Sequence, residues 1–172
     1  LRGSGHHVSV ISSLQMTNTL ARPSEVEDDT CLVAPLCRNG HWSALVAHFG
    51  RVDVAIRHID SMPGLHDRKA AQARLLFLTG RQHSAIREVV TKHHETGKQA
   101  PGLNRCAIHT ALNLAKAALQ MGRVRPPREC IAEMEPVPAH LVDTVAAHLT
   151  GEDRTISPVP VRLLLRRADR GL

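Results

Sequence analysis

Aromatic side chains are scarce in this chain of 172 residues. Phe, Trp and Tyr together make up 2% of it, and Tyr is absent. This composition excludes recognition of RNA by rows of stacked aromatics, and it disfavours an aromatic-rich β-sandwich or barrel. The sequence also lacks any run of 18 apolar residues, so it predicts no membrane-spanning helix.

Cysteine is sparse as well, with Cys31, Cys37, Cys106 and Cys130. Four cysteines are too few for a disulfide-dense scaffold. Cys31, Cys37 and His41 form the pattern C-x5-C-x3-H, but zinc sites usually hold their first cysteine pair two to four residues apart, and no second cluster follows. The twelve histidines are scattered. We therefore expect reduced, idle thiols, no metal site and no cofactor.

Recognisable enzymatic motifs are missing. The sequence contains no P-loop, no G-x-G-x-x-G, no G-x-S-x-G and no H-E-x-x-H. Glu133 and Glu135 lie two residues apart, so they do not face each other on a helix. The sequence therefore predicts no catalytic residue and no small-molecule substrate, and we expect a protein that is not an enzyme.

Positive charge is in excess and consists almost wholly of arginine. Lys and Arg number 22 against 16 Asp and Glu, which gives a net charge of +6, and 18 of the 22 are Arg. Arginine grips phosphate in a bidentate manner and tolerates packed interfaces, which favours an acidic partner, RNA above all. The alternative is that a chain rich in Arg and Ala reflects GC-rich codons.

The first 24 residues hold no acidic side chain, and an acidic run over residues 25–29 follows them abruptly. An acid-free leader with Arg and Ser is typical of mitochondrial transit peptides, although residues 2–7 also read as an expression tag. We expect residues 1–30 to form an extended N-terminal arm or leader remnant, residues 31–172 to form one helical-repeat domain, and the location to be mitochondrial.

Glycine punctuates a recurring pattern in the rest of the chain. The run that begins Gly50-Arg51 and the run that begins Gly80-Arg81 share Gly, Arg, Ala-Ile and Arg at identical offsets, and a looser copy begins at Gly122. Glycine ends a helix without a Cβ penalty, so each copy reads as the turn of a helical hairpin. The apolar spacing predicts helices at 40–49, 52–62, 67–79, 82–94, 103–121, 126–136, 138–149 and 160–168.

The phrase GRVDVAIRHIDSMPG, over residues 50–64, is similar to the second half of tetratricopeptide and pentatricopeptide repeats. The resemblance covers about residues 37–135. It implies an all-α fold in which antiparallel helical hairpins stack as a short α-solenoid; the alternative is a generic helical bundle. Of the positions that read bases in pentatricopeptide proteins, His41, Ala71 and Asn113, only Asn113 is a usual base reader.

Arginines at equal offsets would fall in register in stacked hairpins and form a row that tracks an RNA backbone. A basic C-terminal run extends this set. The predicted phosphate-binding residues are Arg51, Arg57, Arg81, Arg87, Arg123, Arg162, Arg166 and Arg167. The alternatives are that each turn arginine only complements a helix dipole and that the C-terminal run is a capping helix.

These expectations combine into a non-enzymatic scaffold. We expect a subunit of a mitochondrial ribonucleoprotein, such as a mitoribosome or an RNA-processing complex, that contacts RNA phosphates and neighbouring protein subunits. The alternative is a tetratricopeptide-like adaptor or chaperone that holds a peptide helix without RNA.

Overall fold

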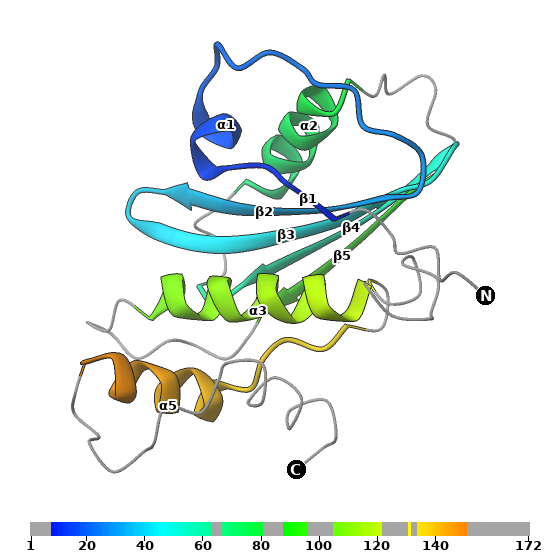
Figure 1. Cartoon of the computed structure of the whole chain (residues 1–172). Coiled ribbons are helices and arrows are strands. Elements are labelled where there is room, and N and C mark those ends of the chain that lie inside the picture. Colours follow the sequence, from blue (N-terminus) through cyan, green and yellow to red (C-terminus); the bar gives the residue numbers. More distant parts are fainter. Residues whose placement is uncertain are drawn as a thin grey trace.

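A five-stranded mixed β-sheet forms the centre of the protein (Figure 1). The computed structural model describes residues 8–62, 67–80, 88–95, 105–121, 131 and 134–150. In these ranges the strands are β1 (Val8–Val10), β2 (Thr30–Arg38), β3 (His41–Phe49), β4 (Asp53–Asp60) and β5 (Glu88–Glu95). The helices are α1 (Ser13–Thr17), α2 (Arg68–Leu78), α3 (Cys106–Met121) and α5 (Ala139–Thr150).

The strands lie in the order β1-β2-β3-β4-β5, with β2, β3 and β4 antiparallel and both outer pairs parallel. A two-residue turn at Asn39 and Gly40 joins β2 to β3. Both turn residues have positive φ, 52° and 75°, as the twist of a tight hairpin requires. The last residue of β2, the first of β3 and the last of β4 therefore lie at one end of the sheet. We call this end, marked by Arg38, His41 and Asp60, the hairpin end.

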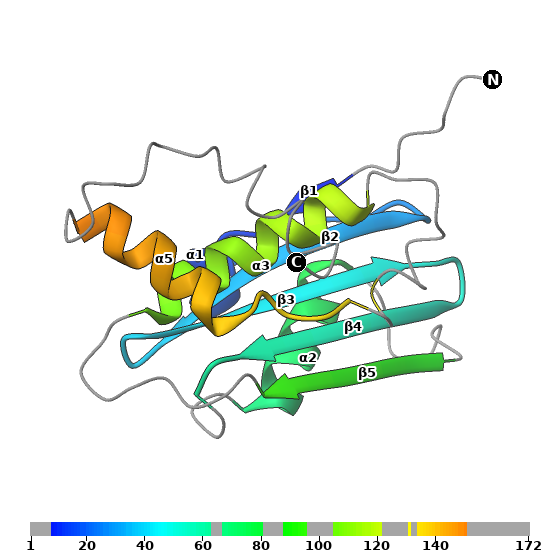
Figure 2. The ribbon, with the colours of Figure 1, turned by 90° about the horizontal axis from the view of Figure 1, so that it is seen from below.

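Helices cover both faces of the sheet (Figures 1 and 2). On one face, α1 and α2 enclose a core that includes Leu45, Phe49 and Ile56. On the other face, α3 covers Ala44, Val46 and Ile59, and α5 packs against α3. None of the helices in the described ranges is long and apolar enough to cross a membrane.

The ends of α2 show how the sequence sets its boundaries. Asp67 caps the first turn, since its Oδ1 accepts hydrogen bonds from the backbone N–H groups of Lys69 and Ala70 at 3.0 and 3.1 Å. After the C-cap Thr79, Gly80 takes a left-handed conformation with φ 67°, which ends the helix as the sequence predicts for this glycine.

The expectation of an all-α solenoid with an extended N-terminal arm is wrong. The segments expected to form helices at 40–49 and 52–62 are β3 and β4, and residues 88–94 of the helix expected at 82–94 belong to β5. Within the expected arm, β1 pairs with β2 and Met16 of α1 packs into the core. The resemblance to tetratricopeptide and pentatricopeptide repeats therefore does not reflect the fold. The domain boundary at residue 30 stays a prediction.

The spacing of apolar residues over 40–62 predicted helices in place of strands because β3 and β4 are buried on both faces. Val54 and Ile56 pack on the side of α2, whereas Ala55 and Ile59 pack on the side of α3. Apolar residues on both faces of a strand produce a run without alternation, and such a run cannot be distinguished from a helix by spacing alone. Val52, the apolar residue that begins the expected helix at 52–62, is 42% exposed.

A substitution at Gly40 distinguishes the hairpin from a helix that begins at this position. A Cβ at Gly40 meets nothing within 4 Å, so only its left-handed backbone opposes Ala. We expect Gly40→Ala to lower the free energy of unfolding by about 1 kcal/mol, measured by urea denaturation. A helix at 40–49 would instead be unaffected or stabilised by Ala.

Candidate active site

A buried histidine and a buried aspartate meet at the hairpin end of the sheet. Nε2 of His41, the first residue of β3, lies 2.6 Å from Oδ1 of Asp60, the last residue of β4. The two residues are 4% and 1% exposed. A polar pair taken so fully out of water is stable only when its members are well bonded to each other.

The backbone fixes the aspartate in place. Oδ1 of Asp60 also accepts a hydrogen bond from the backbone N–H of Met62 at 2.9 Å. An ionised carboxylate only accepts hydrogen bonds, so the bond to Asp60 places a proton on Nε2 of His41. Nδ1 is then the lone-pair nitrogen of this imidazole, and it is the atom suited to take a proton from another group.

A second polar pair lies beside the first. Oγ of Ser43 and Nε2 of His58 are 2.8 Å apart, and both residues are almost fully buried. Ser43 follows His41 by two residues on β3, and His58 precedes Asp60 by two residues on β4, so all four side chains lie on one face of the sheet. The contact between Ser43 and His58 joins β3 to β4, so this pair stabilises the pairing of the two strands.

The amino end of α3 lies at the same end of the sheet and begins with Cys106 (Figures 1 and 2). His109, one turn further along α3, is influenced by the charges of both Asp60 and His41, so the first turn of α3 lies within electrostatic reach of the dyad. The first N–H groups of a helix have no partner within it, and they can donate to an oxyanion that forms beside Cys106.

The other two cysteines in the described ranges are placed differently. Cys31 is fully buried at the start of β2, at the opposite end of the sheet, where it is paired with His48. Cys37 is paired across the hairpin with Trp42 and lines a cavity between β2 and α2 at the hairpin end, and it is not on α3. Cys106, which is 5% exposed at the start of α3, is the candidate nucleophile because His109 of the same helical turn lies within electrostatic reach of Asp60 and His41. Cys130 lies outside the described residues.

A network of polar groups anchors His109. The side-chain N–H of Asn113 donates to the backbone carbonyl of His109 at 2.8 Å, and its Oδ1 accepts from the backbone N–H of Val137 at 2.9 Å. Burial lowers the pKa of His109 from 6.5 to about 4; Asp60 opposes this shift and His41 adds to it. His109 is therefore neutral at physiological pH.

The arginines predicted to bind phosphate are only partly within the described ranges. Arg51 is exposed in the turn between β3 and β4. Arg57 is 4% exposed on β4, and its Nη1 donates to the backbone carbonyl of Ile131 at 3.2 Å. Burial lowers the pKa of Arg57, and Glu135 partly opposes this shift. The remaining predicted phosphate-binding residues lie outside the described residues; they are Arg81, Arg87, Arg123, Arg162, Arg166 and Arg167. Phosphate binding stays a prediction. The fold lacks the stacked hairpins that were expected to align these arginines in a row.

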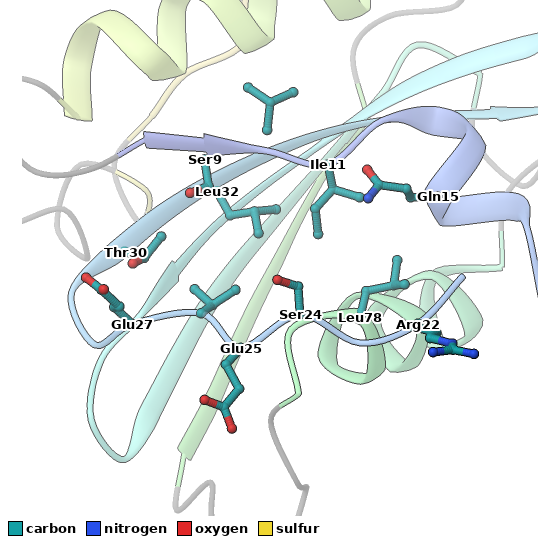
Figure 3. Close-up of a pocket in the computed structure, with 12 residues that line it drawn as sticks. Ser9, Ile11, Gln15, Arg22, Ser24, Glu25, Glu27, Thr30, Leu32 and Leu78 are labelled. Atoms are coloured by element: carbon teal, nitrogen blue, oxygen red, sulfur yellow. The ribbon is translucent and has the colours of Figure 1, made fainter. Parts of the chain in front are cut away.

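A cavity of about 460 Å³ lies at the far end of the sheet from the dyad (Figure 3). Its wall includes Thr30, which is paired with Phe49 at the end of β3. Glu25 and Glu27 border it, and Leu32 and Leu78 contribute apolar surface. No group of three potential metal ligands occurs in the ranges that the structure describes.

Comparison with known proteins identifies the fold. No family model and no curated protein matches the chain. Among solved structures, the chain is similar to one described as the crystal structure of the de-sumoylating protease, with a TM-score of 0.51 and 15% identity over 96% of this chain and 69% of that chain. A second match, the ASFV pS273R protease, has a TM-score of 0.42 and 12% identity over 69% of this chain and 42% of that chain. The first match shows that the chain has the α/β fold of that protease.

This similarity corrects the function expected from the sequence. The non-enzymatic ribonucleoprotein scaffold and the tetratricopeptide-like adaptor both required a helical-repeat surface, whereas the fold is that of a protease structure. The expectation that the chain is not an enzyme rested on a helical-repeat fold, and it is therefore wrong. The mitochondrial location and the RNA and protein partners stay predictions.

The sequence predicts no catalytic residue, although a signal for one is present. His41 falls within the pattern C-x5-C-x3-H and at a position that reads bases in pentatricopeptide proteins, whereas Asp60 belongs to no recognised motif. Asn39-Gly40 between two apolar runs is a strong hairpin signal. Two antiparallel strands that meet at the turn after Phe49 would have placed His41 and Asp60 at the same end of the sheet.

The pKa of His109 predicts a dependence of stability on pH. Between pH 6.5 and 4 the unfolded chain binds a proton at this residue that the folded chain does not, so the free energy of unfolding falls as the pH falls, by about 3 kcal/mol in all. We expect His109→Gln to remove this part of the pH dependence of the free energy of unfolding, measured by urea denaturation at pH 7, 5.5 and 4.

The exposed His140 on α5 provides the matched control. His140→Gln is expected to keep the pH dependence of the unmodified chain. An identical pH dependence in the unmodified chain and in His109→Gln would contradict the burial of a neutral His109.

Proposed function

We propose that this protein is a cysteine protease in which His41 is the general base, Asp60 orients it and Cys106 is the nucleophile. The observation that carries the proposal is the buried 2.6 Å contact between His41 and Asp60 at the end of the sheet where α3 begins. A base held by a third group beside a potential nucleophile is the arrangement that activates thiols in unrelated proteases. The fold of the de-sumoylating protease supports the same assignment.

The reaction follows from these positions. Nδ1 of His41 takes the proton from the thiol of Cys106, and the thiolate attacks the carbonyl carbon of the scissile bond. The N–H groups at the start of α3 stabilise the oxyanion. His41 then returns the proton to the leaving amine, which departs and leaves a thioester. Water, deprotonated by His41, hydrolyses the thioester and releases a carboxylic acid and the free thiol.

The substrate proposed is a polypeptide modifier joined to another protein through its C-terminus. The similar structure is that of a de-sumoylating protease, and this suggests the substrate class. The bond cleaved is then an amide between the modifier's last residue and an amine of its target. The reactive geometry described above serves a peptide and an isopeptide bond equally, because both are amides.

Labelling with a mechanism-based probe tests the nucleophile. A SUMO-type modifier that carries a C-terminal propargylamide is expected to form a covalent adduct on Cys106, identified by peptide mass spectrometry. Cys106→Ala is expected to abolish the adduct, and His41→Ala is expected to slow hydrolysis of a fluorogenic modifier conjugate at least about a thousandfold.

Cys31→Ala is the matched control, since this thiol is buried at the other end of the sheet and is expected to leave labelling and hydrolysis unchanged. An adduct on Cys37, or hydrolysis that survives Cys106→Ala, would overturn the assignment. Absence of labelling in a folded protein with every modifier tested would overturn the proposed protease activity itself.

A further inference from the structure

A cavity of about 670 Å³ opens on the face of the sheet covered by α1 and α2, at the hairpin end. Met16 of α1, Leu36 of β2 and Ala71 of α2 supply apolar surface, and all three belong to or pack against the core of this face. Arg38, Arg74 and Asp67 supply its charged groups. The cavity is therefore part apolar and part charged, as expected for a site that accepts a polypeptide.

This cavity adjoins the dyad through the register of the sheet. Arg38 is the cross-strand partner of His41, and Leu36 is the partner of Ser43. Side chains of directly opposed residues lie on the same face, with Cβ atoms about 5 Å apart. The wall that β2 gives to the cavity is thus continuous with the strand positions that carry His41 and Ser43.

The charged groups of the cavity leave positive charge available. Among the described residues that line the cavity, the one carboxylate belongs to Asp67, and it accepts the backbone N–H groups of Lys69 and Ala70 at the start of α2. Arg74 donates to the backbone carbonyls of Gln15 and Asn18 and lies over the ring of Phe77. These are neutral partners, so both the charge of Arg74 and that of the exposed Arg38 persist at the cavity.

We propose that this cavity is a specificity site that binds an acidic residue of the substrate polypeptide, flanked by an apolar residue, close to the scissile bond. The proposal rests on the proposed protease function for its link to cleavage. Arg38 contacts the substrate carboxylate, and the surface formed by Met16, Leu36 and Ala71 holds the neighbouring apolar side chain. The cavity is mixed in character, which favours a peptide over a nucleic-acid backbone, since a phosphate chain would leave the apolar wall unfilled.

Peptide binding to the full-length Cys106→Ala variant tests the site without turnover. The probes are fluorescein-labelled decapeptides that contain Leu followed by Glu, Gln or Lys at one position and are otherwise identical. At low salt we expect the Glu peptide to bind about fivefold more tightly than the Gln peptide, and the Lys peptide to bind most weakly. We expect the preference to shrink at 0.5 M salt because Arg38 is exposed.

Arg38→Ala and Arg51→Ala form a matched pair of variants. Both arginines are exposed next to a β-turn, but Arg51 lies at the opposite end of the sheet. Arg38→Ala is expected to abolish the preference for Glu over Gln, and Arg51→Ala is expected to keep it. Equal binding of the three peptides, a preference that survives Arg38→Ala, or competition by a short RNA oligonucleotide as effective as the Glu peptide would overturn the proposal.

Kinetics separates this proposal from the proposed function. In an active chain, Arg38→Ala is expected to raise KM about fivefold for the Glu peptide with kcat unchanged, and to leave KM for the Gln peptide unaltered. Glu-selective binding by a chain without hydrolytic activity would overturn the protease function and leave the acidic-peptide site standing. Hydrolysis without any preference for Glu would overturn the acidic-peptide site and leave the protease function standing.

Discussion

The contact between His41 and Asp60 depends on the register of β3 against β4. Phe49 is paired with Val54 and Ala44 with Ile59, and this register places the first residue of β3 within reach of the last residue of β4. A slip of one residue would turn one of the two side chains to the other face of the sheet. The dyad exists because both faces of β3 and β4 are buried, which specifies their register strongly.

One end of the sheet therefore gathers every element of the proposed site. The tight turn at Asn39 and Gly40 returns the chain so that β3 begins at this end, and the antiparallel β4 finishes there with Asp60. The start of α3 and the cavity lined by Arg38 lie at the same end. The other end of the sheet carries a cavity bordered by Glu25 and Glu27, remote from the dyad.

Sequence patterns predicted the helices better than the strands. The helices expected at 67–79, 103–121 and 138–149 correspond to α2, α3 and α5, because each has an apolar stripe on one side and a recognisable end, such as Gly80 after α2. Residues 41–60 carry apolar residues on two faces, so their spacing fits a helix and a strand alike. The contact between His41 and Asp60 was not predictable from local motifs, since 18 residues separate them and only strand pairing joins them.

The most direct test of the account is the rate at which iodoacetamide alkylates Cys106 at pH 6.5, followed by peptide mass spectrometry with Cys37 of the same chain as the internal reference. If His41 takes the thiol proton of Cys106, His41→Ala slows alkylation of Cys106 at least about tenfold relative to Cys37. Equal relative rates in the unmodified chain and in His41→Ala would contradict the link between the dyad and α3.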